Sequence, residues 1–348
     1  MGEEKAGISV FSLDAATGAL DLVQTVSGLR NPTFLATHPT LPLLYAGERE
    51  TTTWGPIETI AGAITTLRIG SDGRLEIVGR EPAGGGATYV SVDPSGRFLF
   101  AAMPGPRCVT VFPLGSDGRV EPASDVAQHH GWGVNTITSY LPFPHSVRPD
   151  ATGARVMACD MGLDRVMVYD LDASSGRLRA APHPYAQLSS GAGPRHLGIH
   201  PSNRFVYTVN EMDSTVSAFS YDAETSALRI VCTVSTRPED FVGHNSGAQI
   251  VVHPSGRFLY SSNRGHNSIA QFRLDEDSGA QTLLGLEPTQ GETPRNFNID
   301  PTGEFLVVAN VGSNNLVSFR IDPATGRLTP TGHSVPTPMP VCVVFHAP

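Results

Sequence analysis

The sequence predicts an all-β fold, a seven-bladed β-propeller, because one apolar unit recurs along the whole chain. Clear copies of the unit begin at Ala87, Pro194, Ala248 and Pro294, and weaker copies begin at Pro32 and Pro144. The turn prolines of these copies recur at intervals of roughly 50 residues, which is longer than a WD40 repeat and close to a kelch repeat. They are Pro39, Pro94, Pro149, Pro201, Pro254 and Pro301.

Each copy predicts four antiparallel strands. In the copy that begins at Ala248, an apolar strand is followed by a Pro-Ser-Gly turn and by a second strand, RFLYSSN, at 257–263. A third strand, SIAQFRLD, follows at 268–275, and another turn leads to a fourth. Proline fixes φ in such a turn and glycine accepts positive φ, so the turn suits a connection between strands. No segment has a long apolar stripe with the helical period, so we expect little helix.

The two ends of the chain together predict one more blade. Residues 339–348, MPVCVVFHAP, repeat the first strand of the unit, and residues 7–26 match its third and fourth strands. We therefore expect the N- and C-terminal strands to close one blade, which removes open sheet edges. The second strand of that blade is missing, which favours a chain shortened at its start and predicts some loss of stability. The whole chain, 1–348, is expected to form a single domain.

Composition limits the classes of partner and cofactor. The formal net charge of −9 at pH 7 disfavours nucleic acid and anionic membranes as partners. The sequence has no apolar N-terminal leader and no apolar run of bilayer length. Its four cysteines lie far apart in no metal-binding spacing, which suits reduced thiols in the cytoplasm. Nucleotide-binding and metalloprotease motifs are absent, so we expect no cofactor and no metal.

Charged residues interrupt the repeat at two positions, the first residue of strand one and the last residue of strand two. They are His145, Arg195 and Arg295 in strand one, and Arg49, Glu211 and Arg264 in strand two. Strand one begins and strand two ends at the same edge of an antiparallel pair, and strand one is the innermost of a blade. We therefore expect these side chains to converge on one mouth of the central channel, with Arg49 at its rim. Such a cluster predicts anion binding and acid–base chemistry.

Other polar positions are expected to have lesser roles. Three histidines that precede turn prolines are interpreted as structural: His38, His200 and His253. His196 follows Arg195 and should point away from it by strand alternation, although it is kept as a candidate for substrate contact. Asn210 belongs to a polar ring at the end of strand two and is a further candidate, and Glu48 is expected to edge the pocket beside Arg49.

Four segments resemble the lactonase family of seven-bladed propellers, which includes the propeller-type 6-phosphogluconolactonase and 3-carboxy-cis,cis-muconate cyclase. They are PHSVRPD at 144–150, PRHLGIHPSNRFVYTVNE at 194–211, SNRGHNSIAQF at 262–272 and TPRNFNIDPTGEFL at 293–306. The resemblance implies that the family's histidine is His145, its arginines are Arg195 and Arg264, and its glutamate is Glu211. The chain departs from the family by an insertion at 48–62 and by the missing strand near its start.

The expected function is metal-independent hydrolysis of a small anionic sugar lactone, with 6-phosphogluconolactone as the leading substrate and a monomer or weak homo-oligomer as the active form. Glu211 is expected to activate water and His145 to donate or relay a proton. Arg195 and Arg264 would stabilise the oxyanion and hold the substrate, with Arg295 as a further anion clamp. Two alternatives remain open: a cycloisomerase that uses the same groups without consuming water, and a propeller that serves as a non-catalytic interaction scaffold.

Overall fold

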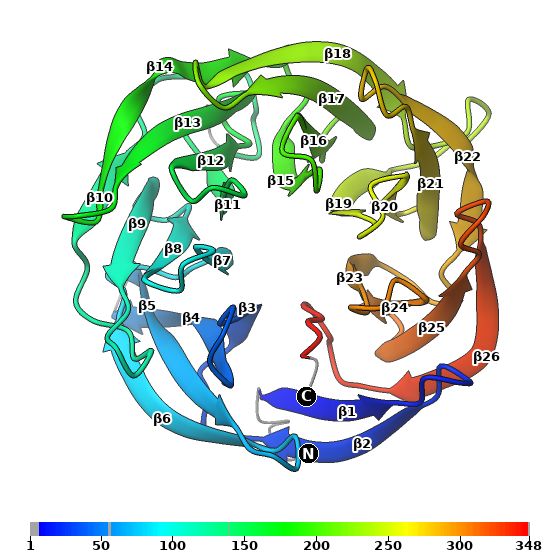
Figure 1. The fold of residues 1–348 in the computed structure, drawn as a ribbon, viewed down its shortest axis with the longest axis horizontal. Coiled ribbons are helices and arrows are strands. Elements are labelled where there is room, and N and C mark those ends of the chain that lie inside the picture. The colour runs from blue at the N-terminus through cyan, green and yellow to red at the C-terminus, as the bar shows by residue number, and fades with distance from the viewer. Residues whose placement is uncertain (1–6, 55–56, 139, 347–348) are drawn as a thin grey trace.

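The computed structural model describes residues 7–54, 57–138 and 140–346. Within these ranges the regular elements are all strands, which are arranged around a central axis as a β-propeller (Figure 1). The expected all-β propeller is therefore confirmed. None of the described residues belongs to a helix with the length and apolarity that a membrane crossing requires.

Six sheets of four antiparallel strands form complete blades, each with its first strand innermost and its fourth outermost (Figure 1). Three of them consist of β3 (Pro32–Thr37), β4 (Leu43–Trp54), β5 (Ile57–Ile69) and β6 (Leu75–Pro82); β7 (Tyr89–Val92), β8 (Phe98–Met103), β9 (Cys108–Pro113) and β10 (Asp125–Gln128); and β11 (Pro144–Pro149), β12 (Arg155–Asp160), β13 (Arg165–Asp172) and β14 (Arg177–Gln187). The other three consist of β15 (Pro194–Ile199), β16 (Phe205–Asn210), β17 (Thr215–Asp222) and β18 (Ala227–Ser235); β19 (Ser246–Val252), β20 (Phe258–Arg264), β21 (Ser268–Leu274) and β22 (Gln281–Pro288); and β23 (Pro294–Ile299), β24 (Phe305–Asn310), β25 (Asn315–Ile321) and β26 (Leu328–Pro336).

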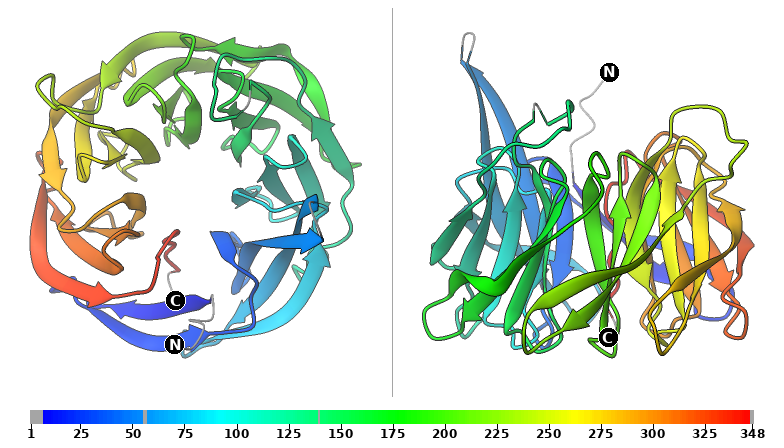
Figure 2. Two further views of the ribbon diagram at one scale, coloured as in Figure 1. Left: turned by 180° about the vertical axis from the view of Figure 1, so that it is seen from behind. Right: turned by 90° about the horizontal axis from the view of Figure 1, so that it is seen from above.

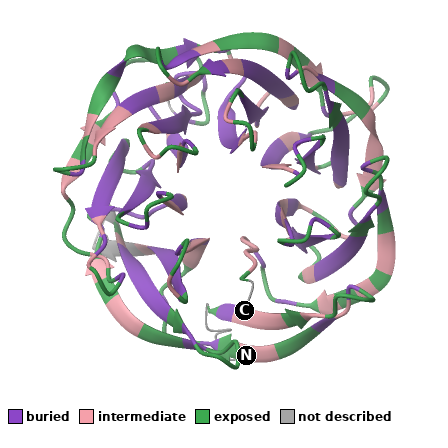
Figure 3. Cartoon of the chain, viewed as in Figure 1, coloured by how far each residue is buried: buried purple, intermediate pink, exposed green. Residues whose placement is uncertain are grey.

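Burial explains the residue pattern of each blade. Second strands such as β8 and β16 are buried at every position, because neighbouring blades cover both of their faces. Outer strands such as β18 expose most of their residues, so polar residues enter their sequences (Figure 3). The core therefore lies between the blades, where rings such as those of Phe112 and Phe219 are fully buried. Burying a ring of this kind stabilises the fold by about 1.5–3 kcal/mol.

The disc has two edges that must be distinguished. We call the mouth edge the one where inner strands begin and second strands end, and the turn edge the one that carries the turn prolines. On the turn edge, Nε2 of His38, His200 and His253 lies 3.1, 2.9 and 2.9 Å from the carbonyl oxygen of a turn glycine in the next blade. These three histidines join adjacent blades, as their structural interpretation predicted.

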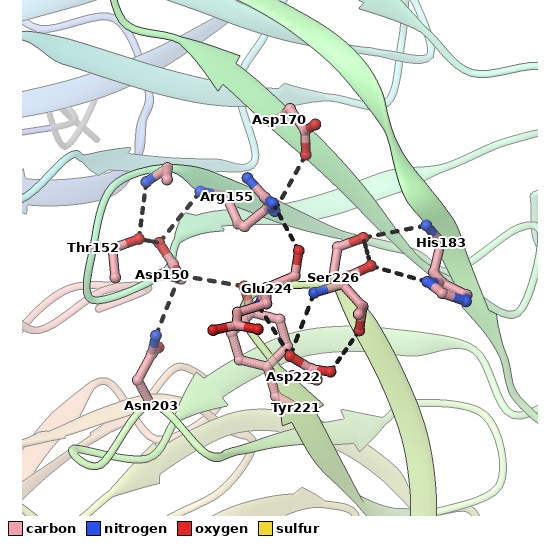
Figure 4. A network of polar contacts seen from close by, with 12 residues as sticks. Asp150, Thr152, Arg155, Asp170, His183, Asn203, Tyr221, Asp222, Glu224 and Ser226 are labelled. Atoms are coloured by element: carbon pink, nitrogen blue, oxygen red, sulfur yellow. Dashed lines mark hydrogen bonds and ion pairs between the residues drawn. The ribbon is translucent and has the colours of Figure 1, made fainter.

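A larger network joins two blades at the same edge (Figure 4). Asp150, after β11, accepts hydrogen bonds from Tyr221 and Asn203 of the next blade, both at 3.2 Å. Arg155 pairs with Asp170 at 3.2 Å within its own blade and donates to the carbonyl oxygen of Glu224 across the boundary. The network lies on the turn edge, so it supports the ring and leaves the mouth free.

The two ends of the chain meet between β26 and β3. Strands β1 (Ile8–Leu13) and β2 (Leu20–Val26) form a two-stranded sheet, which Ser318 of β25 holds through the carbonyl oxygen of Gly18 at 2.7 Å. Residues 341–346 run along the channel beside β23, where the side chains of Asn296 and Asn298 bond to the backbone of Val343 (Figure 1). The predicted C-terminal strand is wrong in one respect: residues 341–346 form no ladder, because no described strand lies between them and β1.

The predicted insertion at 48–62 lengthens β4 and β5. Their ladder continues beyond Glu48, which faces Pro32 at the start of the inner strand. The resulting hairpin rises past one face of the disc (Figure 2). It therefore stands beside the mouth edge, since Glu48 marks that edge of its blade.

Candidate active site

A β-bulge at the start of three inner strands directs side chains into the channel. In β11, β15 and β23 the first proline pairs with the last residue of the second strand, and the register then shifts by one residue. The residues that fall at the shift are His145, Arg195 and Arg295. Because a bulge leaves one residue outside the ladder, it can turn that side chain toward a site.

One carboxylate and two arginines form the centre of the cluster. Oε2 of Glu211, directly after β16, lies 2.8 Å from Nε of Arg195 and 2.9 Å from Nη2 of Arg264. Nε of Arg195 is thus paired with Glu211, whereas Nε of Arg264 is buried without a hydrogen-bond partner among the described residues. Buried N–H groups are usually satisfied, so this donor of Arg264 is available to a ligand.

The charges of the cluster set the protonation of Glu211. Burial alone would raise the pKa of this carboxyl group, but the positive charges of Arg195 and Arg264 outweigh that effect, and the pKa lies below its ordinary value. Glu211 is therefore a carboxylate at neutral pH. Its weak basicity limits its ability to take a proton from water.

Arg295 adds a positive charge that lacks a partner in the part of the chain that the structure describes. Its pKa is lowered first by burial and then by repulsion from Arg264, with a smaller repulsion from Arg49. Three arginines thus lie around the single carboxylate of Glu211, and Arg49 lies near Arg295, in a protein whose overall charge is negative. This excess of positive charge makes the mouth a site for an anion.

Buried aromatic rings lie beneath the arginines. The ring of His196 lies 5.1 Å from that of His145, 5.0 Å from that of Tyr89 and 5.7 Å from that of Phe34. The rings of Phe34 and Tyr89 stack at 3.9 Å. These rings come from four inner strands, so they give the charged mouth a compact floor.

The two histidines of the floor are neutral at physiological pH. Burial, followed by repulsion from Arg195, lowers the pKa of His145 and that of His196 well below their ordinary value. Nδ1 of His145 is buried and has no hydrogen-bond partner among the described residues. His145 therefore offers a neutral ring to a bound molecule, with one nitrogen unused.

Comparison with known proteins identifies the family. The family profile described as "Lactonase, 7-bladed beta-propeller" matches residues 2–345. The chain belongs to the Lactonase family. This lactonase-family chain is 35% identical over 297 residues to a 6-phosphogluconolactonase of Serratia proteamaculans (strain 568), covering 85% of the chain and 82% of the relative.

Two further comparisons agree with this membership. The lactonase-family chain is 37% identical over 302 residues to a 6-phosphogluconolactonase of Pectobacterium carotovorum subsp. carotovorum (strain PC1), covering 85% of the chain and 82% of the relative. Among solved structures, the periplasmic gluconolactonase PpgL of Pseudomonas aeruginosa superposes with a TM-score of 0.88 at 29% identity, covering 97% of this chain and 94% of that one.

The placement of His196 corrects the expectation from strand alternation. Nη1 of Arg195 lies 3.1 Å from Nε2 of His196, so the two side chains meet instead of pointing apart. The register shift at Arg195 breaks the alternation on which the expectation depended. His196 thus lies in the floor of the mouth, and contact with a substrate stays a prediction.

Asn210 and Glu48 do not reach the mouth. Asn210 is fully buried, and its amide donates to Thr215 at 2.8 Å and to Ser217 at 3.0 Å within its own blade. Glu48 is 1% exposed and pairs with Arg80 at 2.8 Å. The expected placements of both at the pocket are wrong, because both side chains point into their own blades.

Sequence reasoning missed Tyr89, Phe34 and Gln249. Each is the second residue of an inner strand in the repeat, and the same position holds His196 and Asn296 in neighbouring blades. Large and polar residues at a position that faces the channel were the available signal. It was overlooked because alternation suggested that only the first residue of each inner strand faces inward.

Proposed function

We propose that this protein hydrolyses an anionic sugar lactone, and that 6-phosphogluconolactone, which opens to 6-phosphogluconate in the pentose phosphate pathway, is its substrate. The observation that carries the proposal is the mouth itself, where four arginines and one carboxylate lie near a buried neutral histidine with an unused nitrogen. The names of the two bacterial relatives point to the same reaction. A substrate with two negative charges would offset the positive excess.

The mechanism that fits this geometry assigns the base to His145. Water attacks the lactone carbonyl carbon while its proton passes to Nδ1 of His145, which is neutral and has no other partner. The ring C–O bond of the resulting tetrahedral intermediate then breaks, and the imidazolium returns the proton to the leaving alkoxide. Repulsion from Arg195 makes this imidazolium a strong acid, which favours the return.

Glu211 has a different task in this scheme from the one its sequence position suggested. Its carboxylate is bound to two arginines and has a lowered pKa, so it is poorly suited to take a proton from water. We assign it the positioning of Arg195 and Arg264. The free Nε–H group of Arg264 and the positive charge of Arg195 would stabilise the oxyanion of the intermediate.

The phosphate would bind at Arg295 and Arg49. Guanidinium groups bind phosphate oxygens bidentately, and Arg295 has no other partner among the described residues. The positive charges of Arg295 and Arg49 lie close enough to repel each other, so the two arginines could bind one phosphate together. The lactone would then bind beside the phosphate, next to His145.

The same proposal covers the assembly of the ring. We propose that β1, β2 and residues 341–346 occupy a seventh blade position, and that 1–348 is one domain. The bond from Ser318 to Gly18 and the bonds from Asn296 and Asn298 to Val343 support this, because they attach both ends to the last complete blade.

The chemical setting follows from the residues at the mouth. We propose metal-independent catalysis, because a mouth with four arginines repels a cation, and no group of three His, Cys, Asp or Glu among the described residues is placed to hold one. We also propose a cytoplasmic monomer or weak homo-oligomer that binds a small anionic lactone and neither nucleic acid nor membrane. The four free cysteines and the acidic overall charge support this setting.

The test is acid release from fresh 6-phosphogluconolactone at neutral pH, compared with unphosphorylated gluconolactone and with Glu211→Gln. We expect the wild-type protein to accelerate hydrolysis above the spontaneous rate, to prefer the phosphorylated lactone, and to lose about 100-fold in kcat in the variant. No acceleration by folded wild-type protein would overturn the proposal. Turnover of a carboxymuconolactone without net hydrolysis would instead identify the cycloisomerase.

A further inference from the structure

Gln249 reaches the floor of the mouth from β19, the inner strand of the blade next to that of His196. Oε1 of Gln249 lies 2.6 Å from Nδ1 of His196, and both side chains are buried. The orientation of the amide is fixed twice: Oε1 accepts a hydrogen bond from the backbone N–H of Ile250 at 3.2 Å, and Nε2 donates to the carbonyl oxygen of Phe297 at 3.3 Å. The atom that faces His196 is therefore the oxygen.

This contact determines the tautomer of His196. A carboxamide oxygen only accepts, so Nδ1 of His196 must carry the proton. In a neutral ring the proton on Nδ1 leaves a lone pair on Nε2. Nη1 of Arg195 lies 3.1 Å from Nε2 and 3.5 Å from Nδ1, so the guanidinium packs on the face of this neutral ring. The opposite tautomer would set two acceptors, Nδ1 of His196 and Oε1 of Gln249, against each other at 2.6 Å.

The same strand holds Arg195 a second time. Nη1 of Arg195 also donates to the carbonyl oxygen of Ala248, the residue before Gln249. The carbonyl oxygen of Ala248 and the ring of His196 thus restrain one end of the guanidinium, while its Nε faces Glu211 at 2.8 Å. The guanidinium is therefore held from both ends.

We propose that Gln249 is a positioning residue, which fixes His196 as the Nδ1–H tautomer and through it holds the guanidinium of Arg195 in the orientation needed at the mouth. The kinetic part of this inference rests on the proposed lactonase function. The tautomer can be measured without it.

Several titratable or charged groups face His196 and bear on any titration of its ring. They are Tyr89 from β7, His145 from β11, Arg195 from β15, Arg264 from β20 and Arg295 from β23. The three arginines oppose a second proton on the ring. Gln249→Glu can offset this repulsion, because it places a carboxylate against Nδ1 of His196 and keeps the shape of the side chain at 249.

The experiment compares wild type with Gln249→Met, Gln249→Glu and the control Gln271→Met. Gln271 is a buried glutamine of β21 in the same blade, which accepts from the backbone N–H of Leu328 at 2.7 Å away from the mouth. Nitrogen-15 NMR of labelled histidine, with His196 assigned by its loss in His196→Gln, gives the tautomer. Lactone hydrolysis gives kcat and KM across pH.

We expect wild type and Gln271→Met to show His196 as the Nδ1–H tautomer, and Gln249→Met to show a mixture. We expect Gln249→Met to lose about 10-fold in kcat with little change in KM, because Arg195 is no longer aligned. Gln249→Glu should raise the pKa of His196, so that activity is lost toward low pH, where the ring is charged and repels Arg195, and recovers as pH rises.

An unchanged tautomer and unchanged kinetics in Gln249→Met would overturn the inference, as would a pH profile of Gln249→Glu that matches wild type. If Gln249→Met does not fold, the glutamate variant decides through its NMR spectrum and pH profile. If wild type shows the fixed tautomer but hydrolyses no lactone, the proposed function fails while the assignment of the tautomer stands.

Discussion

The two edges of the disc both carry histidines at repeating positions, yet they treat them differently. On the turn edge, His253 uses both ring nitrogens: Nδ1 contacts Ser255 at 2.8 Å and Nε2 contacts the carbonyl oxygen of Gly303 at 2.9 Å. On the mouth edge, Nδ1 of His145 is buried with no partner among the described residues. The contacts of His253 join two blades, whereas the unpaired nitrogen of His145 is available to a ligand.

Arginines follow the same division. Arg204 and Arg257 on the turn edge extend over the surface and donate to backbone carbonyl oxygens of the next blade. Arg195 and Arg264 on the mouth edge are drawn inward to the carboxylate of Glu211. Residue type alone therefore does not reveal function in this repeat; the direction and the partner of each side chain do.

The largest effect is expected from Arg195→Gln. Loss of this guanidinium removes an oxyanion donor and a partner of Glu211, so kcat should fall about 100- to 1,000-fold. Steady-state hydrolysis of 6-phosphogluconolactone measures it, with Arg204→Gln on the turn edge as the matched control. Equal losses in both variants would erase the distinction between the edges.

Acidification should inactivate the enzyme only below the ordinary range of histidine. His145 must be neutral to accept a proton, and its folded-state pKa is depressed by burial and by Arg195, so kcat/KM should stay level from pH 8 to about 6.5 and fall at lower pH. The depressed pKa also means that unfolded chains bind more protons, so the free energy of unfolding decreases as pH falls below about 6.5. Equilibrium unfolding of wild type and His145→Gln checks this, and an equal pH dependence in both would contradict it.

A smaller effect is expected from Arg295→Gln. This residue is assigned to the phosphate, so KM for 6-phosphogluconolactone should rise about 10-fold while kcat changes little. The KM for unphosphorylated gluconolactone should not respond. Arg257→Gln provides the control, and a fall in kcat without a change in KM would move Arg295 from the phosphate to the reacting carbonyl.

The smallest effect on activity is expected from His253→Ala. Its hydrogen bond to the next blade is structural, so the variant should lose about 1–2 kcal/mol in the free energy of unfolding and keep its kcat. Chemical denaturation and hydrolysis rates at a temperature below the transition measure the two quantities. A large loss of kcat in a stably folded variant would show that the turn edge also serves catalysis.

The repeat made the blades and most of the mouth predictable. Aligning the copies placed His145, Arg195, Glu211 and Arg264 at one edge, and the structure brings Glu211 into contact with both arginines. Their common edge follows from the antiparallel order of strands one and two, which every copy encodes in its turn.

The remaining features depend on local backbone geometry that the repeat does not encode. The bulge at Arg195 turned His196 into the floor, and strict alternation could not anticipate it. The expected placement of Asn210 was wrong because successive residues of a strand point in opposite directions: Glu211 faces the mouth, whereas Asn210 is buried in the blade. Residues 341–346 kept the apolar pattern of a strand but form no ladder, because a strand needs a hydrogen-bonded neighbour as well as a sequence.

We propose that residues of the mouth edge hydrolyse the lactone, whereas residues of the turn edge support the fold. The most direct measurement is the rate of 6-phosphogluconolactone hydrolysis by His145→Gln and His253→Gln, each shown to be folded by its thermal transition. The account predicts that His145→Gln loses about 100-fold or more in kcat and that His253→Gln retains the wild-type rate. Full activity in His145→Gln, or equal losses in the two variants, would contradict it.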